Sequence, residues 1–129
     1  MYRLTTDAPK DNHSTALNLF YVQNGETMVR GGGPAPDYPD VTLDDYIRRI
    51  AEAYHIDLDK GADSDEALHD VMYELLFDGI DTLDGIVATL YAAGWAFASL
   101  REKLKRYEDT GLEPTEVADM KHRMDGLEK

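Results

Sequence analysis

Two β-prone segments flank an Asn-Gly dipeptide in the first quarter of the chain. Residues 17–22 and 27–30 place apolar side chains on both faces of an extended strand, and Asn24-Gly25 lies between them. An Asn-Gly pair favours the type I′ turn of a hairpin, because both residues accept positive φ angles. We therefore expect a β-hairpin, preceded by an irregular arm over residues 1–15. One face should pack on helices and the other on further strands or a second subunit, since a two-stranded ribbon is marginally stable alone.

The apolar positions adopt a helical period after residue 41. Helix N-caps are expected at Thr42 and at either Asp81 or Thr82, and Gly79 and Gly111 stand where helices should end. The expected fold class is α+β, an N-terminal β-hairpin followed by a mostly helical region of three to four helices. These helices are predicted over residues 42–54, 65–78, 82–111 and 114–126.

The chain length suits a single domain, because 129 residues support one core rather than two. Residues 1–40 would hold the hairpin and a loop rich in glycine and proline, and residues 41–129 the helical part. The third predicted helix carries small side chains on several faces over residues 92–99. Small side chains let another helix approach closely, so we expect a homo-oligomer built on this helix.

Composition narrows the functional classes. The chain has 26 acidic and 13 basic residues, a net charge of −13 and no cysteine. The charge argues against direct DNA or RNA binding, which depends on basic side chains that neutralise phosphates. The missing cysteines exclude disulfides, thiol nucleophiles and cysteine-based metal sites. The longest apolar stretch, residues 86–100, is shorter than the ~20 residues of a membrane span, and no secretory signal is visible. We therefore expect no membrane association and a location in the cytoplasm.

Most of the acidity lies in the middle of the chain. Residues 41–85 hold thirteen acidic and three basic side chains, whereas the C-terminal third is nearly neutral. Such a block predicts a surface that attracts a basic protein partner. The candidate partner-binding residues are Asp44, Asp45, Asp57, Asp59, Asp63, Asp65, Glu66 and Asp70.

The chain also contains one candidate anion site. Arg30 precedes three glycines, Gly31, Gly32 and Gly33, whose amides could approach a phosphate, and Arg106 ends a basic run on the third helix. The pattern lacks the context of a P-loop or a dinucleotide fold. A plain connecting loop is the simpler interpretation, so these five residues are candidate ligand contacts only.

No motif predicts catalysis, a metal or a cofactor. Two Glu-x-x-His pairs, Glu52 with His55 and Glu66 with His69, resemble di-iron ligands, but helical spacing turns them away from the core. The acidic run from Asp57 departs from the calcium-loop pattern at three of its defining positions. No serine lies in a nucleophile-elbow motif. We expect a protein that is not an enzyme.

One segment carries a family resemblance. Residues 100–117 read L-R-E-K-L-K-R-Y-E-D-T-G-L-E-P-T-E-V, which resembles the "L-x-x-Y-E-D-T-G-L-x-P-E-E-V" tail of small phage and prophage accessory proteins from Gram-positive anaerobes. The opening residues 1–7, running into a hairpin, are similar to such proteins too. The match covers about 18 residues of 129 and supplies no catalytic residues.

The resemblance implies a phage-encoded, non-enzymatic accessory binding protein in the cytoplasm of an infected bacterium. The leading hypothesis is an inhibitor of a bacterial immune system, similar to an anti-CRISPR protein, that blocks a host defence protein through its acidic 41–85 surface. A second hypothesis is an oligomeric sponge of the anti-Thoeris or anti-CBASS type, which would sequester a nucleotide signal at Arg30 and its glycine loop or at Arg106. A third is a structural or regulatory phage protein.

Overall fold

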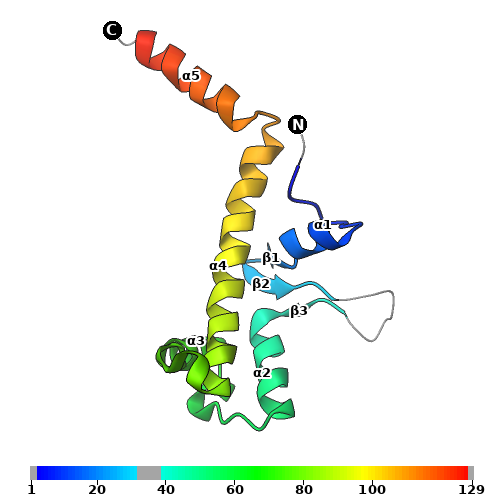
Figure 1. Cartoon of the computed structure of the whole chain (residues 1–129), viewed down its shortest axis with the longest axis vertical. Helices are drawn as coiled ribbons and strands as arrows, with labels where there is room; N and C mark the ends of the chain where they lie inside the picture. The colour runs from blue at the N-terminus through cyan, green and yellow to red at the C-terminus, as the bar shows by residue number, and fades with distance from the viewer. Residues whose placement is uncertain (1–2, 32–38, 128–129) are drawn as a thin grey trace.

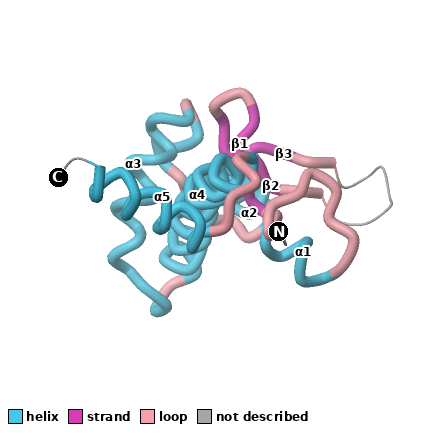
Figure 2. The backbone as a smooth tube through the Cα atoms, turned by 90° about the horizontal axis from the view of Figure 1, so that it is seen from above, coloured by secondary structure: helices cyan, strands magenta, loops and turns pink. Residues whose placement is uncertain are grey.

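A computed structural model describes residues 3–31 and 39–127 of the chain. The fold is α+β, with a three-stranded antiparallel sheet and a set of helices arranged along one long helix, α4 (Figure 1). Seen from above, the strands and α1 lie on one side of α4, and α3 lies on the other (Figure 2). In chain order the elements are α1 (Asn12–Leu17), β1 (Phe20–Gln23), β2 (Glu26–Val29), β3 (Val41–Thr42), α2 (Leu43–Ala53), η1 (Asp59–Ala62), α3 (Asp65–Leu75), η2 (Leu76–Asp81), α4 (Leu83–Asp109) and α5 (Pro114–Leu127).

The predicted hairpin is confirmed. Strands β1 and β2 pair antiparallel, with Phe20 opposite Val29, and Asn24 and Gly25 adopt φ angles of 54° and 77° at the turn. A third strand, β3, extends the sheet from the other side of β2. It has two residues, which is too short to produce a visible period in the sequence.

The irregular arm expected over residues 1–15 is wrong in part, because residues 12–17 form helix α1. Asp11 caps this helix by accepting a hydrogen bond from the Ser14 backbone, and the Ser14 hydroxyl accepts one from the Asp11 backbone. This reciprocal capping box stabilises a helix too short to show an apolar period. The first strand consequently begins at Phe20 rather than at residue 17.

The helical region agrees with prediction except at one junction. Thr42 caps α2 as expected, and Thr82 rather than Asp81 caps α4, through hydrogen bonds from the backbones of Asp45 and Gly85. Helix α3 ends at Leu75 instead of residue 78, and η2 follows it directly. Within η2, Gly79 takes a φ of 61° and a ψ of −141°, a conformation that favours glycine and turns the chain into α4.

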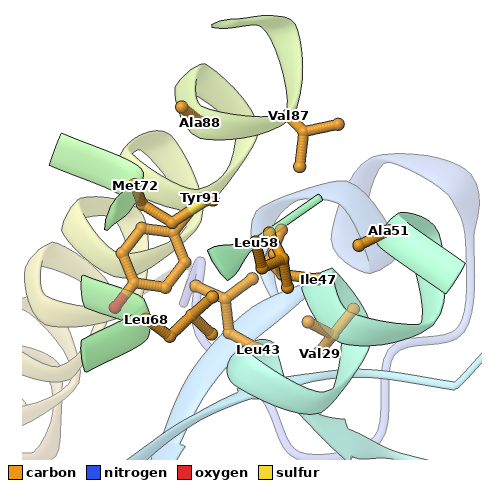
Figure 3. Close-up of a cluster of buried hydrophobic side chains, with 10 residues drawn as sticks. All are labelled: Val29, Leu43, Ile47, Ala51, Leu58, Leu68, Met72, Val87, Ala88 and Tyr91. Carbon is orange, nitrogen blue, oxygen red and sulfur yellow. The ribbon is translucent and has the colours of Figure 1, made fainter. Parts of the chain in front are cut away.

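The hydrophobic core lies between α2, α3 and the N-terminal half of α4 (Figure 3). Each helix contributes one stripe of buried side chains, as its apolar spacing predicts. The buried residues are Val29 from β2, Leu43, Ile47 and Ala51 from α2, Leu58 just before η1, Leu68 and Met72 from α3, and Val87, Ala88 and Tyr91 from α4.

Gly94 and Ala98, two of the small residues in the middle of α4, are buried within the chain, whereas Ala93, Ala96 and Ser99 are exposed. A methyl group added at Gly94 would lie 2.7 Å from Cε1 of Phe20, so β1 rests directly on the helix backbone there. Phe20 also meets Phe97 edge to face, with ring centroids 6.0 Å apart, and Ala98 is fully buried. Gly94, one of the residues that suggested close approach of a second chain, therefore accommodates this chain's own hairpin.

A polar network fastens residues 3–18 to the C-terminal half of α4. Arg101 Nε donates to Asn18 Oδ1, and the Glu108 carboxylate accepts from the backbones of Leu4 and Thr5.

Among the described residues, α4 meets the length and hydropathy criteria for a membrane span, a test that core helices also pass.

Candidate functional site

A cavity of about 310 Å³ opens where the hairpin turn meets the starts of α2 and α3. Its walls carry carboxylates from three elements and aromatic rings from α4. The side chains that define its chemistry are Glu26 from β2, Asp44 from α2, Asp65, Glu66 and His69 from α3, and Tyr91 and Trp95 from α4.

Local helix chemistry explains why the carboxylates gather here. Asp44 lies in the first turn of α2, and Asp65 and Glu66 lie in the first turn of α3. Acidic residues are favoured at helix N-termini, because the exposed N–H groups carry partial positive charge. Arg48 joins the two helices, since its guanidinium donates to the carboxylates of Asp45, at 3.2 Å, and Asp65, at 2.8 Å.

The surroundings of Asp44 disfavour the ionised form of its carboxyl group. Burial, and then the negative charge of Asp65, raises the pKa of Asp44 to about 6, although Arg48 partly opposes the shift. At pH 7 the cavity therefore holds a carboxylate that lacks full compensation. A cation entering the cavity would relieve this charge.

His69 is the centre of an aromatic cluster. Its Nδ1 lies 3.1 Å from the hydroxyl oxygen of Tyr91. Its ring centroid lies 4.6 Å from that of Tyr73, 5.9 Å from that of Tyr91 and 6.2 Å from that of Trp95. Burial, and then the charge of Asp44, raises the pKa of Tyr91 to about 12, so this hydroxyl stays protonated at neutral pH.

The arrangement suits recognition of an organic cation. Carboxylates provide charge-assisted acceptors for an ammonium or a guanidinium group, and the faces of Tyr and Trp rings attract the same groups. Within residues 3–31 and 39–127, no three His, Asp or Glu side chains are placed to hold a metal ion. Trp95 is 43% exposed, so its ring is open to a ligand at the cavity mouth.

The predicted acidic residues divide into three groups. Asp44, Asp65 and Glu66 meet in the cavity, and Asp45 lies beside them through Arg48. Asp59 and Asp70 line a separate depression on α3 and η1. Asp57 and Asp63 are exposed near η1, where the Asp57 carboxylate accepts from the backbone of Asp59.

Sequence reasoning missed His69, Tyr91 and Trp95 as members of the site. His69 is half-buried against aromatic rings, which corrects its predicted outward position. The rings come from α3 and α4, so the fold brings them together. The spacing of four residues between His69 and Tyr73, and between Tyr91 and Trp95, is the only local signal that could have indicated paired rings.

The candidate anion contacts do not converge in the described residues. The Arg30 guanidinium lies 4.6 Å from the ring centroid of Tyr21, and it donates to the carbonyls of Asn18 and Asp7. The Gly31 N–H donates to the Asp40 carboxylate at 2.7 Å. Burial alone would raise the pKa of Asp40, but hydrogen bonds from Tyr21 and Gly31 outweigh it and lower the pKa. A carboxylate of the chain itself thus occupies the place of an anion.

The remaining anion candidates are Arg106, Gly32 and Gly33. Arg106 is exposed in the last turn of α4, about 7.5 Å along the helix from Arg101, which itself neighbours Tyr21. Gly32 and Gly33 lie outside the described residues.

Comparison of the chain with protein-family models, curated proteins and solved structures gives no match.

Proposed function

We propose that the protein is a non-enzymatic binding protein whose acidic 41–85 surface docks on a basic protein, with the cavity beside Asp44 and Asp65 receiving an arginine or lysine side chain. The observation that carries this proposal is the cavity itself, which combines carboxylates with aromatic walls. The resemblance of residues 100–117 to phage accessory proteins adds the biological setting. In that setting the partner is a bacterial immune protein, inhibited in the cytoplasm of the infected host.

Charge complementarity supports a basic partner. Eleven of the thirteen acidic side chains in residues 41–85 are exposed, and Arg48, one of only three basic residues there, is already paired with Asp45 and Asp65. The surface therefore presents a nearly uncompensated negative field. Such a field accelerates encounter with a positively charged surface and discriminates against acidic ones.

Two exposed apolar side chains favour a protein partner over a small cation. Phe77 and Ile80 are 91% and 87% exposed on η2, and Asp78 and Asp81 are exposed beside them. Protein interfaces commonly combine a few apolar or aromatic anchors with a polar rim. Burying one such side chain contributes about 1.5–3 kcal/mol, so these residues can anchor what the charges attract.

The cavity can be tested directly because Trp95 is the only tryptophan. Its fluorescence should change when an amidated tri-arginine peptide is titrated into the protein, and a tri-glutamine peptide should have no effect. Asp44→Asn and Asp65→Asn should each weaken arginine-peptide binding by about fivefold or more. Asp70→Asn removes an equal charge outside the cavity and serves as the matched control.

Two results would contradict this role for the cavity. One is equal weakening by all three variants, which would show a diffuse charge effect. The other is binding that changes by less than about twofold between low and physiological salt, because screening must reduce an electrostatic attraction. The biological setting is tested by expressing the chain in bacteria with defined defence systems and measuring phage plating. Restored plating that is lost in the Phe77→Ser variant supports it, and unchanged plating with every system argues against it.

The sponge hypothesis has weaker structural support. Three donors expected to face a nucleotide, at Arg30 and Gly31, already bond to groups of the chain itself. Calorimetry with cyclic oligonucleotides and cyclic ADP-ribose variants distinguishes the two functions. Binding heat with any of them would favour sequestration over the blocking of a basic protein.

A further inference from the structure

Helix α5 points away from the rest of the molecule (Figure 1). Every residue from Pro114 to Gly126 is exposed. A helix of 14 residues is near the length at which isolated helices become marginal in water, even with favourable sequences. Packing of an apolar face normally supplies the missing stability.

The helix has an apolar stripe on one side. Val117, Met120 and Met124 follow a spacing of three and four residues and are 38%, 50% and 61% exposed. At its start the stripe runs into a cavity of about 420 Å³ between α4 and α5, where Val117 joins the apolar side chains of Leu104 and Tyr107. This apolar surface continues from α4 onto α5 and is uncovered in the part of the chain that the structure describes.

Charges beside the stripe indicate what covers it. The spacing places Val117 and Met124 at position a, and Met120 at position d, of a coiled-coil heptad. Glu116 then occupies position g and Lys121 position e. In a parallel pair of helices, position g faces position e of the partner five residues further along, so Glu116 of each copy would meet Lys121 of the other.

The alternative orientation is less favourable. In an antiparallel pair, positions e face each other and positions g face each other. The antiparallel register that packs Met120 on Met124 would set Lys121 against Lys121 and Arg123, at position g, against Arg123. A register that set Glu116 against Arg123 would leave Met124 beyond the start of the partner's α5. Asp119, His122 and Asp125 fall at positions c, f and b, on the outside of either pair. The charge pattern therefore fits a parallel seam between two identical helices.

We propose that α5 pairs in parallel with α5 of a second copy, so that the protein forms a homodimer through this helix. The seam differs from the interface expected at residues 92–99, where Gly94 and Ala98 already pack within the chain. Figure 1 shows α5 and α3 at opposite ends of α4. Both acidic surfaces of the dimer consequently remain open to partners.

Sedimentation equilibrium of the full chain tests the dimer. The apparent mass should rise from 14.5 kDa towards twice that value over the micromolar range, because a seam this short gives a weak, reversible dimer. Met120→Glu and Met124→Glu should shift dissociation to at least about tenfold higher concentration. His122→Glu, on the outer face of the same helix, and Ala96→Glu, on the exposed side of α4, are the matched controls and should leave the dimer intact.

A charge exchange tests the parallel register. Residues 116 and 121 form two pairs in the dimer, one on each side of the seam. Glu116→Lys and Lys121→Glu should each weaken the dimer, because each makes both pairs like-charged. The double variant restores opposite charges and should recover wild-type association. Circular dichroism should show that every variant keeps the folded body. A wild-type chain that stays monomeric, a dimer broken by Ala96→Glu but not by Met120→Glu, or a dimer strengthened by Lys121→Glu alone would each overturn the proposal.

Discussion

Arg101 Nε donates to Asn18 Oδ1 at 2.8 Å between two buried side chains that are 83 residues apart in the chain. The side-chain amide of Asn18 uses both of its donor hydrogens and accepts two hydrogen bonds in this position. Its Oδ1 also accepts from the Thr6 backbone, and its Nδ2 donates to the carbonyls of Leu4 and Ser14. One amide side chain therefore joins the N-terminal segment, α1 and α4.

Removing this amide should destabilise the protein strongly. We expect Asn18→Ala to lower the free energy of unfolding by about 2–4 kcal/mol, because a buried guanidinium and several backbone groups lose partners. Urea unfolding followed by circular dichroism measures the change. Arg106→Ala, at an exposed position of the same helix, should cost less than about 0.5 kcal/mol. Equal effects of the two substitutions would contradict the network.

The Glu108 carboxylate should make stability depend on acid. Burial alone would raise the pKa of Glu108, but hydrogen bonds from Thr5 and Leu4, with the charge of Arg3, outweigh it and lower the pKa. The folded pKa therefore lies below the unfolded value of about 4.5. The stabilisation is present above that value and is lost as the pH falls through the folded pKa.

Glu108→Gln should accordingly destabilise the protein at pH 7 and have a much smaller effect near pH 3. Urea midpoints at the two pH values measure this difference. Glu52→Gln, on the exposed side of α2, should leave both midpoints nearly unchanged. A Glu108→Gln effect of the same size at both pH values would show that the hydrogen bonds do not depend on ionisation.

Asp44 should have the opposite dependence. Its pKa is raised from 3.8 to about 6, so ionising it in the folded protein costs stability as the pH rises from about 4 to above 6. We expect Asp44→Asn to be more stable than the wild type at pH 7 by about 1 kcal/mol, after allowance for solvent screening. The difference should vanish near pH 3.

Denaturant unfolding at the two pH values, with the carboxyl resonance of Asp44 followed by NMR, measures this prediction. The resonance separates Asp44 from its titrating neighbours Asp65, Glu66 and His69. A midpoint near 4 would show that the cavity does not perturb Asp44. The expected gain in stability is typical of a residue kept for binding at the expense of folding.

Gly94 offers a test in which two effects have opposite signs. Alanine is the better helix former by about 1 kcal/mol, so propensity alone predicts that Gly94→Ala stabilises the protein. The new methyl group would lie 2.7 Å from the Phe20 ring, and this overpacking should reverse the sign and destabilise by about 1–3 kcal/mol. Thermal unfolding measures the change, and Phe20→Leu should relieve part of it.

Gly126→Ala is the matched control for Gly94→Ala. Nothing lies within 4 Å of the added methyl group at Gly126, so this substitution should not destabilise the chain. A stabilising Gly94→Ala would indicate that β1 does not rest on α4.

Features that depend on a few neighbouring residues were predictable from the sequence alone. Asn24-Gly25 specified the hairpin turn, and Thr42 and Thr82 specified helix starts. The acidic block over residues 41–85 could be found by counting charged residues along the sequence. The turn and the helix starts rest on backbone geometry or capping within about four residues. Helix α1 was local too, but its six residues are too few for a period to be visible.

Only the tertiary structure decided which distant residues meet. The cavity joins Asp44, Asp65 and Trp95 from three helices, and Gly94 is small because of Phe20, which precedes it by 74 residues. The outcome at such positions depends on how whole elements pack, because burial and contact across the core follow from three-dimensional arrangement rather than from local period. For the same reason we propose the oligomer seam on the apolar stripe of α5 instead of the middle of α4, where the hairpin packs on Gly94.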